Sequence, residues 1–162
     1  MRALLIAAVL ALAACDRADG QVSSASAEEA RAFLAENKAQ SGVITTASGL
    51  QYKIVRAGPK DAPLAREGDE VKVHYEGKLP SGEVFDSSYE QGAPAVFTVG
   101  QLVEGWNEAL QLMRPGDELL LWVPPELGYG EEGVGPIPPN AVLVFRMEML
   151  GVLPKSGGVA LG

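Results

Sequence analysis

Aromatic side chains beside turns are the residues of this sequence whose types and spacing could form a site. They fall on separate predicted strands, a helix and a glycine-rich loop, and a carboxylate directly follows one of them. Core packing explains any single one of these side chains. A polar group at the margin of an apolar surface, however, is typical of a pocket that orients a ligand without covalent chemistry. The candidate residues are Tyr75, Phe85, Asp86, Trp106, Tyr129, Ile137 and Phe145.

Other kinds of site are disfavoured by the remaining residue types. With one His and one Cys, the chain cannot assemble a usual zinc site, and His74 has no Ser and Asp spaced to make a triad. The glycines at 128, 130 and 133 match a dinucleotide fingerprint, but prolines follow where that motif needs a helix. The formal net charge is −8 and no basic stripe is present, which argues against nucleic-acid binding. We therefore expect no metal, no cofactor and no nucleic-acid partner.

Alternating apolar and polar residues predict the strands that position these candidates. One helix is predicted at 105–113, where Trp106, Ala109, Leu110 and Met113 share a face before Pro115 and Gly116 end it. The fold class expected is α+β, with a curved antiparallel sheet of five to six strands wrapped on this short amphipathic helix and preceded by a short N-terminal helix. The strands are predicted within 42–57, at 71–75, around 85–86, at 97–100, at 119–123 and at 143–149.

The N-terminal 26 residues have the composition of a bacterial lipoprotein leader followed by a tether. Arg2 precedes an apolar run at 3–11 that is too short to span a bilayer. Leu-Ala-Ala-Cys at 12–15 resembles a lipobox, in which the Cys thiol is acylated; ordinary cleavage that leaves a free thiol is the alternative. We predict a signal peptide over 1–14, lipidation of Cys15 with a flexible tether over 15–26, and a place in the bacterial cell envelope, lipid-anchored and facing the periplasm.

The rest of the chain divides into three further segments. A helical pattern with a capping box predicts a short N-terminal helix over 27–41, and the main domain covers 42–153. A disordered tail is expected over 154–162. Because so short a helix is marginal on its own, we expect a monomer and not a helical dimer.

From about residue 49 to 153 the sequence resembles the FKBP family of peptidyl-prolyl cis-trans isomerases, and in particular its bacterial Mip-type secreted members. The matching segments read V-H-Y at 73–75, V-F-D-S-S at 84–88, V-E-G-W at 103–106, G-Y-G at 128–130, I-P-P-N-A at 137–141 and L-V-F at 143–145. This resemblance implies an FKBP-like fold and an enzyme that accelerates Xaa-Pro rotation in proline-containing polypeptide clients, such as folding secreted or envelope proteins.

The resemblance also implies a role for each candidate. Trp106 is expected under the proline ring, with Tyr75, Phe85 and Phe145 as walls and Asp86 beside the twisting amide. The Tyr129 hydroxyl and the Val103 N–H are expected to bind substrate carbonyls, with Leu102 and Ile137 as aliphatic neighbours.

Three departures from the family pattern affect macrolide inhibition and substrate preference more than they affect the fold. Ala95 stands where many members have an aromatic, Gln91 where some have an Arg paired to the Asp, and the flap after Tyr129 is about one residue shorter. The alternative function is a peptide-binding holdase that keeps the pocket but isomerises poorly.

Overall fold

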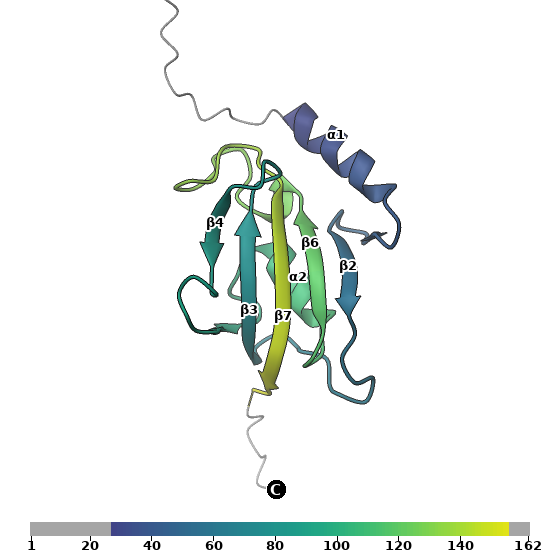
Figure 1. Cartoon of the computed structure of the whole chain (residues 1–162), viewed down its shortest axis with the longest axis vertical. Helices are drawn as coiled ribbons and strands as arrows, with labels where there is room; N and C mark the ends of the chain where they lie inside the picture. Colours follow the sequence, from purple (N-terminus) through teal and green to yellow (C-terminus); the bar gives the residue numbers. More distant parts are fainter. Residues whose placement is uncertain (1–26, 156–162) are drawn as a thin grey trace, which may run out of the picture.

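The computed structural model describes residues 27–155, and their strands form one curved sheet with a helix in its concave face (Figure 1). The predicted signal peptide, Cys15, the tether and residues 156–162 of the predicted tail lie outside the described residues. The helical segments are α1 (Ala27–Lys38), α2 (Glu104–Gln111) and the short 3-10 turn η1 (Pro125–Leu127). The strands are β1 (Ile44–Thr45), β2 (Gln51–Arg56), β3 (Glu70–Lys78), β4 (Val84–Ser87), β5 (Ala95–Thr98), β6 (Glu118–Val123) and β7 (Leu143–Leu153).

All strand pairs are antiparallel, in the order β1-β2-β6-β7-β3-β4, with β5 paired to β3 beside β4. The longest strand, β7, lies in the middle and pairs with both β6 and β3. The predicted fold class is confirmed, although the sheet has seven strands where five to six were expected. The additional strand, β1, has only two residues, too few for alternation to reveal it.

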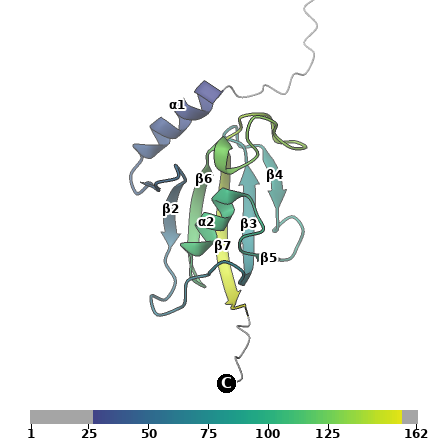
Figure 2. The same ribbon diagram turned by 180° about the vertical axis from the view of Figure 1, so that it is seen from behind.

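Helix α2 covers the concave face of the sheet, as the view from behind shows (Figure 2). Its buried face contains Trp106, Ala109 and Leu110, three of the residues whose spacing predicted the helix. The inward residues of the strands belong to the same hydrophobic core: Val71, Val73 and Tyr75 on β3, and Leu143, Phe145, Met147 and Met149 on β7. On β3 and β7, alternation therefore identified the face that carries the core.

The unbroken apolar run at 119–123 suggests a strand buried on both faces, but in β6 only the inward apolar residues are buried. Leu119, Leu121 and Val123 are buried, whereas Leu120 and Trp122 are half-buried. The outer face of the sheet is open over β6 because α1 lies at the edge of the sheet beside β2 (Figure 1).

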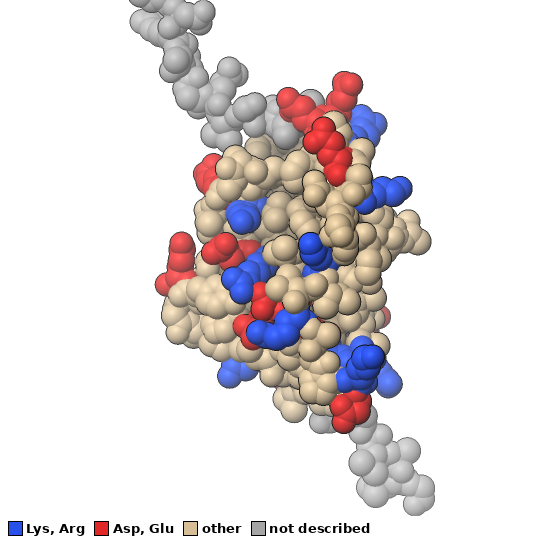
Figure 3. Space-filling model, turned by 45° about the vertical axis from the view of Figure 1, so that its right-hand side comes forward, with Lys and Arg blue, Asp and Glu red and all other residues tan. Residues whose placement is uncertain are grey.

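Charged residues of both signs are interspersed on this outer face (Figure 3). Glu118, whose side chain is 6% exposed, bonds Arg146 Nε at 2.6 Å and lies 3.4 Å from Arg56 Nη1. Arg56 also pairs with Glu148. His74 lies at an outward position of β3, and its ring stacks on the Tyr89 ring with a centroid distance of 4.5 Å. The ion pairs link Arg56, Glu118, Arg146 and Glu148 to one another across β2, β6 and β7.

One amide side chain of the main domain makes two hydrogen bonds to the short helix α1. Gln51, buried on β2, donates to the Leu34 carbonyl and accepts from Asn37 Nδ2, both at 2.8 Å. Ala30 is the buried residue of this helix. Across residues 27–155, no helix has the length and apolar character needed to cross a membrane.

Asp69, next to Glu70 in a turn before β3, has the sequence context of a solvated loop acid, and the structure corrects this interpretation. It is buried, and its carboxylate accepts the backbone N–H groups of Arg66 and Lys155, both at 2.9 Å. These bonds lower the pKa of Asp69, the bond from Lys155 having the largest effect. The carboxylate thereby joins the loop before β3 to the chain end after β7.

Candidate functional site

An aromatic cavity of about 160 Å³ opens between α2 and the β3–β4 side of the sheet. It brings together eight of the nine residues predicted for the pocket: Tyr75, Phe85, Asp86, Leu102, Val103, Trp106, Tyr129 and Phe145. They come from β3, β4, α2 and its N-terminus, the loop after η1, and β7. Segments that are distant in sequence therefore meet at one hollow.

Trp106 forms the floor of this cavity and is held by rings that meet it edge to face. Tyr75, Phe97 and Phe145 lie at centroid distances of 5.0, 5.4 and 5.2 Å, with interplanar angles of 84°, 87° and 85°. Edge-to-face contacts are the favourable arrangement for aromatic pairs. Because the three rings fix its orientation, the indole presents a rigid apolar surface.

The rings of Phe85 and Phe145 meet edge to face, with a centroid distance of 5.7 Å and an interplanar angle of 89°. The aromatic wall therefore continues from β7 onto β4. Gly77 makes this contact possible, since a Cβ there would lie 2.6 Å from Phe145 Cε1 and 2.8 Å from the Phe85 ring. Any side chain at position 77 would displace the rings.

Asp86 is the charged residue of the cavity wall, and both of its oxygens are held. The Tyr75 hydroxyl donates to Oδ2 at 2.7 Å and Gln91 Nε2 donates to Oδ1 at 3.0 Å. Burial raises the pKa of Tyr75, and the bond to Asp86 raises it further, so the phenol remains a donor throughout the physiological range. The carboxylate is oriented by two neutral groups.

The position of Tyr75 is in turn fixed by Ser88, which is fully buried. Its Oγ accepts the Tyr75 N–H at 2.9 Å and lies 3.2 Å from the Tyr75 carbonyl, to which it can donate. His74 Nδ1 lies 2.9 Å from the same oxygen. This hydroxyl attaches the end of β4 to β3 at the residue that holds Asp86.

Asn107 organises the opposite rim, where the chain enters α2. Its Oδ1 accepts the N–H groups of Gly100 and Leu102, and its Nδ2 donates to the Leu102 carbonyl at 2.7 Å. Val103 follows directly as the N-cap residue of α2. Within the described residues its N–H has no protein acceptor, so it is available to a ligand.

Tyr129 reaches the cavity from the loop after η1, and 41% of its surface is exposed. The loop is closed by Val134 and Ile137, which exchange backbone hydrogen bonds at 3.0 and 2.8 Å. Ile137 is buried in the hydrophobic core and does not line the cavity. Its predicted contact with a substrate stays a prediction.

Four residues that serve this cavity were not among the predicted site residues. Phe97 lines it from β5, Gln91 and Asn107 hold polar parts of the rim, and Gly77 leaves room for two rings. Two of them carry a signal in the sequence: Phe97 is an aromatic of the strand predicted at 97–100, and Gln91 stands where some family members have an Arg paired to the Asp. Asn107 and Gly77 act through contacts that only the folded chain creates.

The fold and this cavity define a small α+β domain that presents an aromatic pocket, with a carboxylate and free hydrogen-bonding groups at its rim. A family profile described as "FKBP-type peptidyl-prolyl cis-trans isomerase" matches residues 62–150. A second, "Domain amino terminal to FKBP-type peptidyl-prolyl isomerase", matches residues 6–54. The chain belongs to the FKBP-type peptidyl-prolyl isomerase family.

Curated relatives agree with this assignment. The chain is 48% identical over 130 residues to "Peptidyl-prolyl cis-trans isomerase Mip" of Coxiella burnetii, covering 80% of this chain and 56% of that protein. It is 44% identical over 142 residues to the "FKBP-type 22 kDa peptidyl-prolyl cis-trans isomerase" of Escherichia coli, covering 85% of this chain and 68% of that one. The chain spans about half the length of several such relatives, 53% and 44% in two further cases.

Solved structures resemble the described fold. FkpA from Escherichia coli superposes with a TM-score of 0.73 at 39% identity, covering 78% of this chain and 59% of that one. A peptidyl-prolyl cis-trans isomerase from Pseudomonas syringae also gives 0.73, at 34% identity, covering 78% of this chain and 92% of its own.

Proposed function

We propose that this protein catalyses cis-trans isomerisation of Xaa-Pro bonds in polypeptides that fold in the bacterial cell envelope. The observation that carries the proposal is the cavity itself, in which a rigid Trp106 floor lies beside an oriented Asp86 carboxylate. Family membership supports the same reaction class.

Each predicted residue has a role in this proposal. Trp106 supports the proline ring, and Tyr75, Phe85 and Phe145 enclose it. The Tyr129 hydroxyl and the Val103 N–H bind carbonyl groups on either side of the bond, which fixes the peptide while the amide turns. Leu102 and Ile137 contribute aliphatic contacts or support, and Asp86 places negative charge near the rotating group.

The physical basis is differential binding of the twisted amide. Rotation about a peptide bond costs about 18–20 kcal/mol because resonance is lost, and uncatalysed Xaa-Pro exchange takes tens to hundreds of seconds. The twisted amide has less charge separation than the planar one, so an apolar cavity favours it. Each ~1.36 kcal/mol of that preference accelerates rotation about tenfold. No nucleophile is required.

The test measures cis-trans exchange in a blocked Ala-Leu-Pro-Phe peptide by NMR, with the full chain in a neutral detergent. Asp86→Asn keeps the shape of the side chain, Trp106→Leu removes the floor, and Tyr129→Phe removes one hydroxyl. Tyr89→Phe is the matched control, since Tyr89 is similarly exposed but stacks on His74 on the outer face. We expect wild type and Tyr89→Phe to accelerate exchange and the three pocket variants to lose at least tenfold.

Binding without acceleration by the wild-type chain would instead support the holdase alternative. Acceleration that survives in all three pocket variants would show that the assigned residues are wrong.

We propose further that Cys15 is lipidated and anchors the protein in the envelope, facing the periplasm. The support is the Leu-Ala-Ala-Cys sequence after an apolar run, together with a relative from Legionella longbeachae named "Outer membrane protein MIP". Mass spectrometry of the mature protein tests this directly. An acylated N-terminal peptide beginning at Cys15, absent in Cys15→Ser, is expected; an unmodified thiol would refute the anchor.

A further inference from the structure

The carboxylate of Asp86 in the pocket wall is held by two uncharged side chains and, in the part of the chain that the structure describes, is not paired with a cation. Asp86 receives a hydrogen bond on each oxygen, and both donors, Tyr75 and Gln91, are uncharged. Among the residues that line the cavity, Asp86 is the charged one. In the described chain the ion pairs join Arg56 or Arg146 to Glu118 or Glu148 on the outer face, and none includes Asp86. The carboxylate is therefore oriented without being neutralised.

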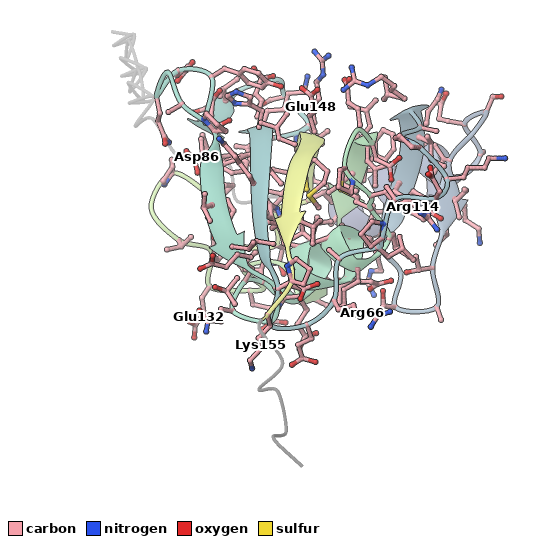
Figure 4. The ribbon with its side chains drawn as sticks, turned by 90° about the horizontal axis from the view of Figure 1, so that it is seen from below. Arg66, Asp86, Arg114, Glu132, Glu148 and Lys155 are labelled. Carbon is pink, nitrogen blue, oxygen red and sulfur yellow. The ribbon has the colours of Figure 1, made fainter. Side chains whose placement is uncertain are left out.

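The segments that build the pocket rim reinforce this charge. Residues 84–104, which contain β4, β5 and the entry to α2, include three acids and no Lys, Arg or His. Residues 124–142, which contain the loop of Tyr129, also include three acids and no basic residue. Figure 4 shows Asp86 and Glu132 on one side of the molecule, and Arg114 on the other. The six acids are Asp86, Glu90, Glu104, Glu126, Glu131 and Glu132.

The third contributor to the pocket, β3, turns its basic residues away from it. Its buried positions, Val71, Val73, Tyr75 and Gly77, alternate with Lys72, His74 and Lys78. Because alternate residues of a strand point to opposite faces, these three side chains project to the outer face of the sheet. These three segments therefore place acidic residues, and no basic side chain of their own, on the open side of the pocket.

We infer that this pocket selects Xaa-Pro segments with a Lys or Arg within a few residues of the proline, and that Gln91 is the positioning residue that sustains this selectivity. Gln91 holds Asp86 at the rim and leaves its charge intact for a cationic client side chain. The inference rests on the proposed isomerase function and adds a substrate class to it. In a water-like medium, a unit charge about 8 Å from Asp86 changes the affinity of the client by roughly 2.4-fold, upward for a cation and downward for an anion. Exchanging Lys for Glu in the client combines both effects, so the rate changes about fivefold or more.

The experiment compares three blocked peptides that share one Leu-Pro bond and carry Lys, Ala or Glu two residues before it, and a second set with the change two residues after it. The rate measured is kcat/KM for exchange with the full chain in neutral detergent, at about 20 mM and 500 mM salt. The variant Gln91→Arg places a cation beside Asp86. Gln40→Arg is the matched control, because Gln40 is exposed and follows α1, at the opposite edge of the sheet.

We expect a Lys-to-Glu rate ratio of at least about fivefold at low salt in one peptide set, falling towards one at high salt. Gln91→Arg should bring the low-salt ratio towards one, whereas Gln40→Arg should retain it. A ratio near one in wild type, with the Ala peptide still accelerated, overturns this inference and leaves the proposed function in place. A ratio that Gln91→Arg does not change also overturns it. Failure to accelerate even the Ala peptide overturns the proposed function itself.

Discussion

Replacing Gly77 by alanine tests whether the close contact between β3 and the aromatic wall governs both stability and catalysis. The added methyl carbon would lie 2.6 Å from Phe145 Cε1 and 2.8 Å from the Phe85 ring. Carbon atoms pack best at about 3.5–4.0 Å, so the rings must retreat by about 1 Å. Phe145 cannot retreat freely because its ring already meets Trp106 at 5.2 Å.

The expected cost follows from this geometry. Overpacking of this kind destabilises a core by about 1–3 kcal/mol. Displacing the Phe145 wall and the Trp106 floor by about 1 Å should reduce kcat/KM by roughly 10- to 100-fold, because catalysis here depends on positioning. Urea unfolding followed by tryptophan fluorescence measures the stability, and exchange of the Leu-Pro peptide measures the activity.

Gly151→Ala provides the matched control. Gly151 lies on β7, and a Cβ there would meet no atom within 4 Å. We expect this variant to remain within about 0.5 kcal/mol of wild type and fully active. If Gly77→Ala is as stable and as active as Gly151→Ala, the wall is not closely packed and the reasoning fails.

Three further predictions concern other parts of the fold. Gly105→Ala should destabilise the protein by about 1–2 kcal/mol in urea unfolding despite alanine's higher helix propensity, since its Cβ would lie 2.5 Å from Val123 Cγ1. Asp69→Asn should lower stability at pH 7. Because the folded pKa of Asp69 lies below the ordinary 3.8, this difference should shrink as the pH falls from about 4 through the lowered pKa, measured by urea unfolding across that range. Glu118→Gln should cost about 1–2 kcal/mol at low salt and less at 1 M salt, because its partner Arg146 is exposed to solvent.

Each of these has a result that would contradict it. A Gly105→Ala protein more stable than wild type would show that α2 has room to move from β6. If Asp69→Asn lowers the free energy of unfolding equally at pH 7 and pH 3, the stabilising hydrogen bonds of Asp69 do not depend on the charge of its carboxylate. Glu118→Gln should be compared with Glu36→Gln on exposed α1; equal effects would leave the ion pairs without a measurable role.

Much of the fold could be predicted because burial imposes a period on the sequence. Val71, Val73 and Tyr75 on β3, and Trp106 and Leu110 on α2, are buried in the pattern expected of a strand and a helix. The prediction from the sequence failed where the burial of a strand depends on which other element covers its outer face. The apolar side chains Leu120 and Trp122 suggested cover on both sides of β6, but α1 lies beside β2 and leaves them half-buried.

The pocket aromatics could be predicted because each stands beside a turn and matches a family motif. Most of their supporting residues could not. The family resemblance placed Gln91 near Asp86 without showing that it donates to Oδ1, and Asn107 is a polar helix residue whose value depends on the loop that brings Leu102 to it. Asp69 looked like any loop acid until Lys155, 86 residues later, supplied its second bond. Such contacts link distant positions, and a single sequence contains no period or spacing that reveals them.

A pocket that acts without covalent chemistry depends on how firmly its polar groups are held before the client arrives. Asp86 is fixed by two donors, and its donor Tyr75 is fixed in turn by buried Ser88. The entry to α2 is fixed by Asn107, which accepts the N–H groups of Gly100 and Leu102 and donates to the Leu102 carbonyl. For the proposed mechanism this means that the groups around the twisted amide are ordered during folding, so little of the binding energy is lost to ordering the site. The same rigidity explains why the charge of Asp86 can select clients: a carboxylate that cannot turn away from the pocket exerts its field on every peptide that enters.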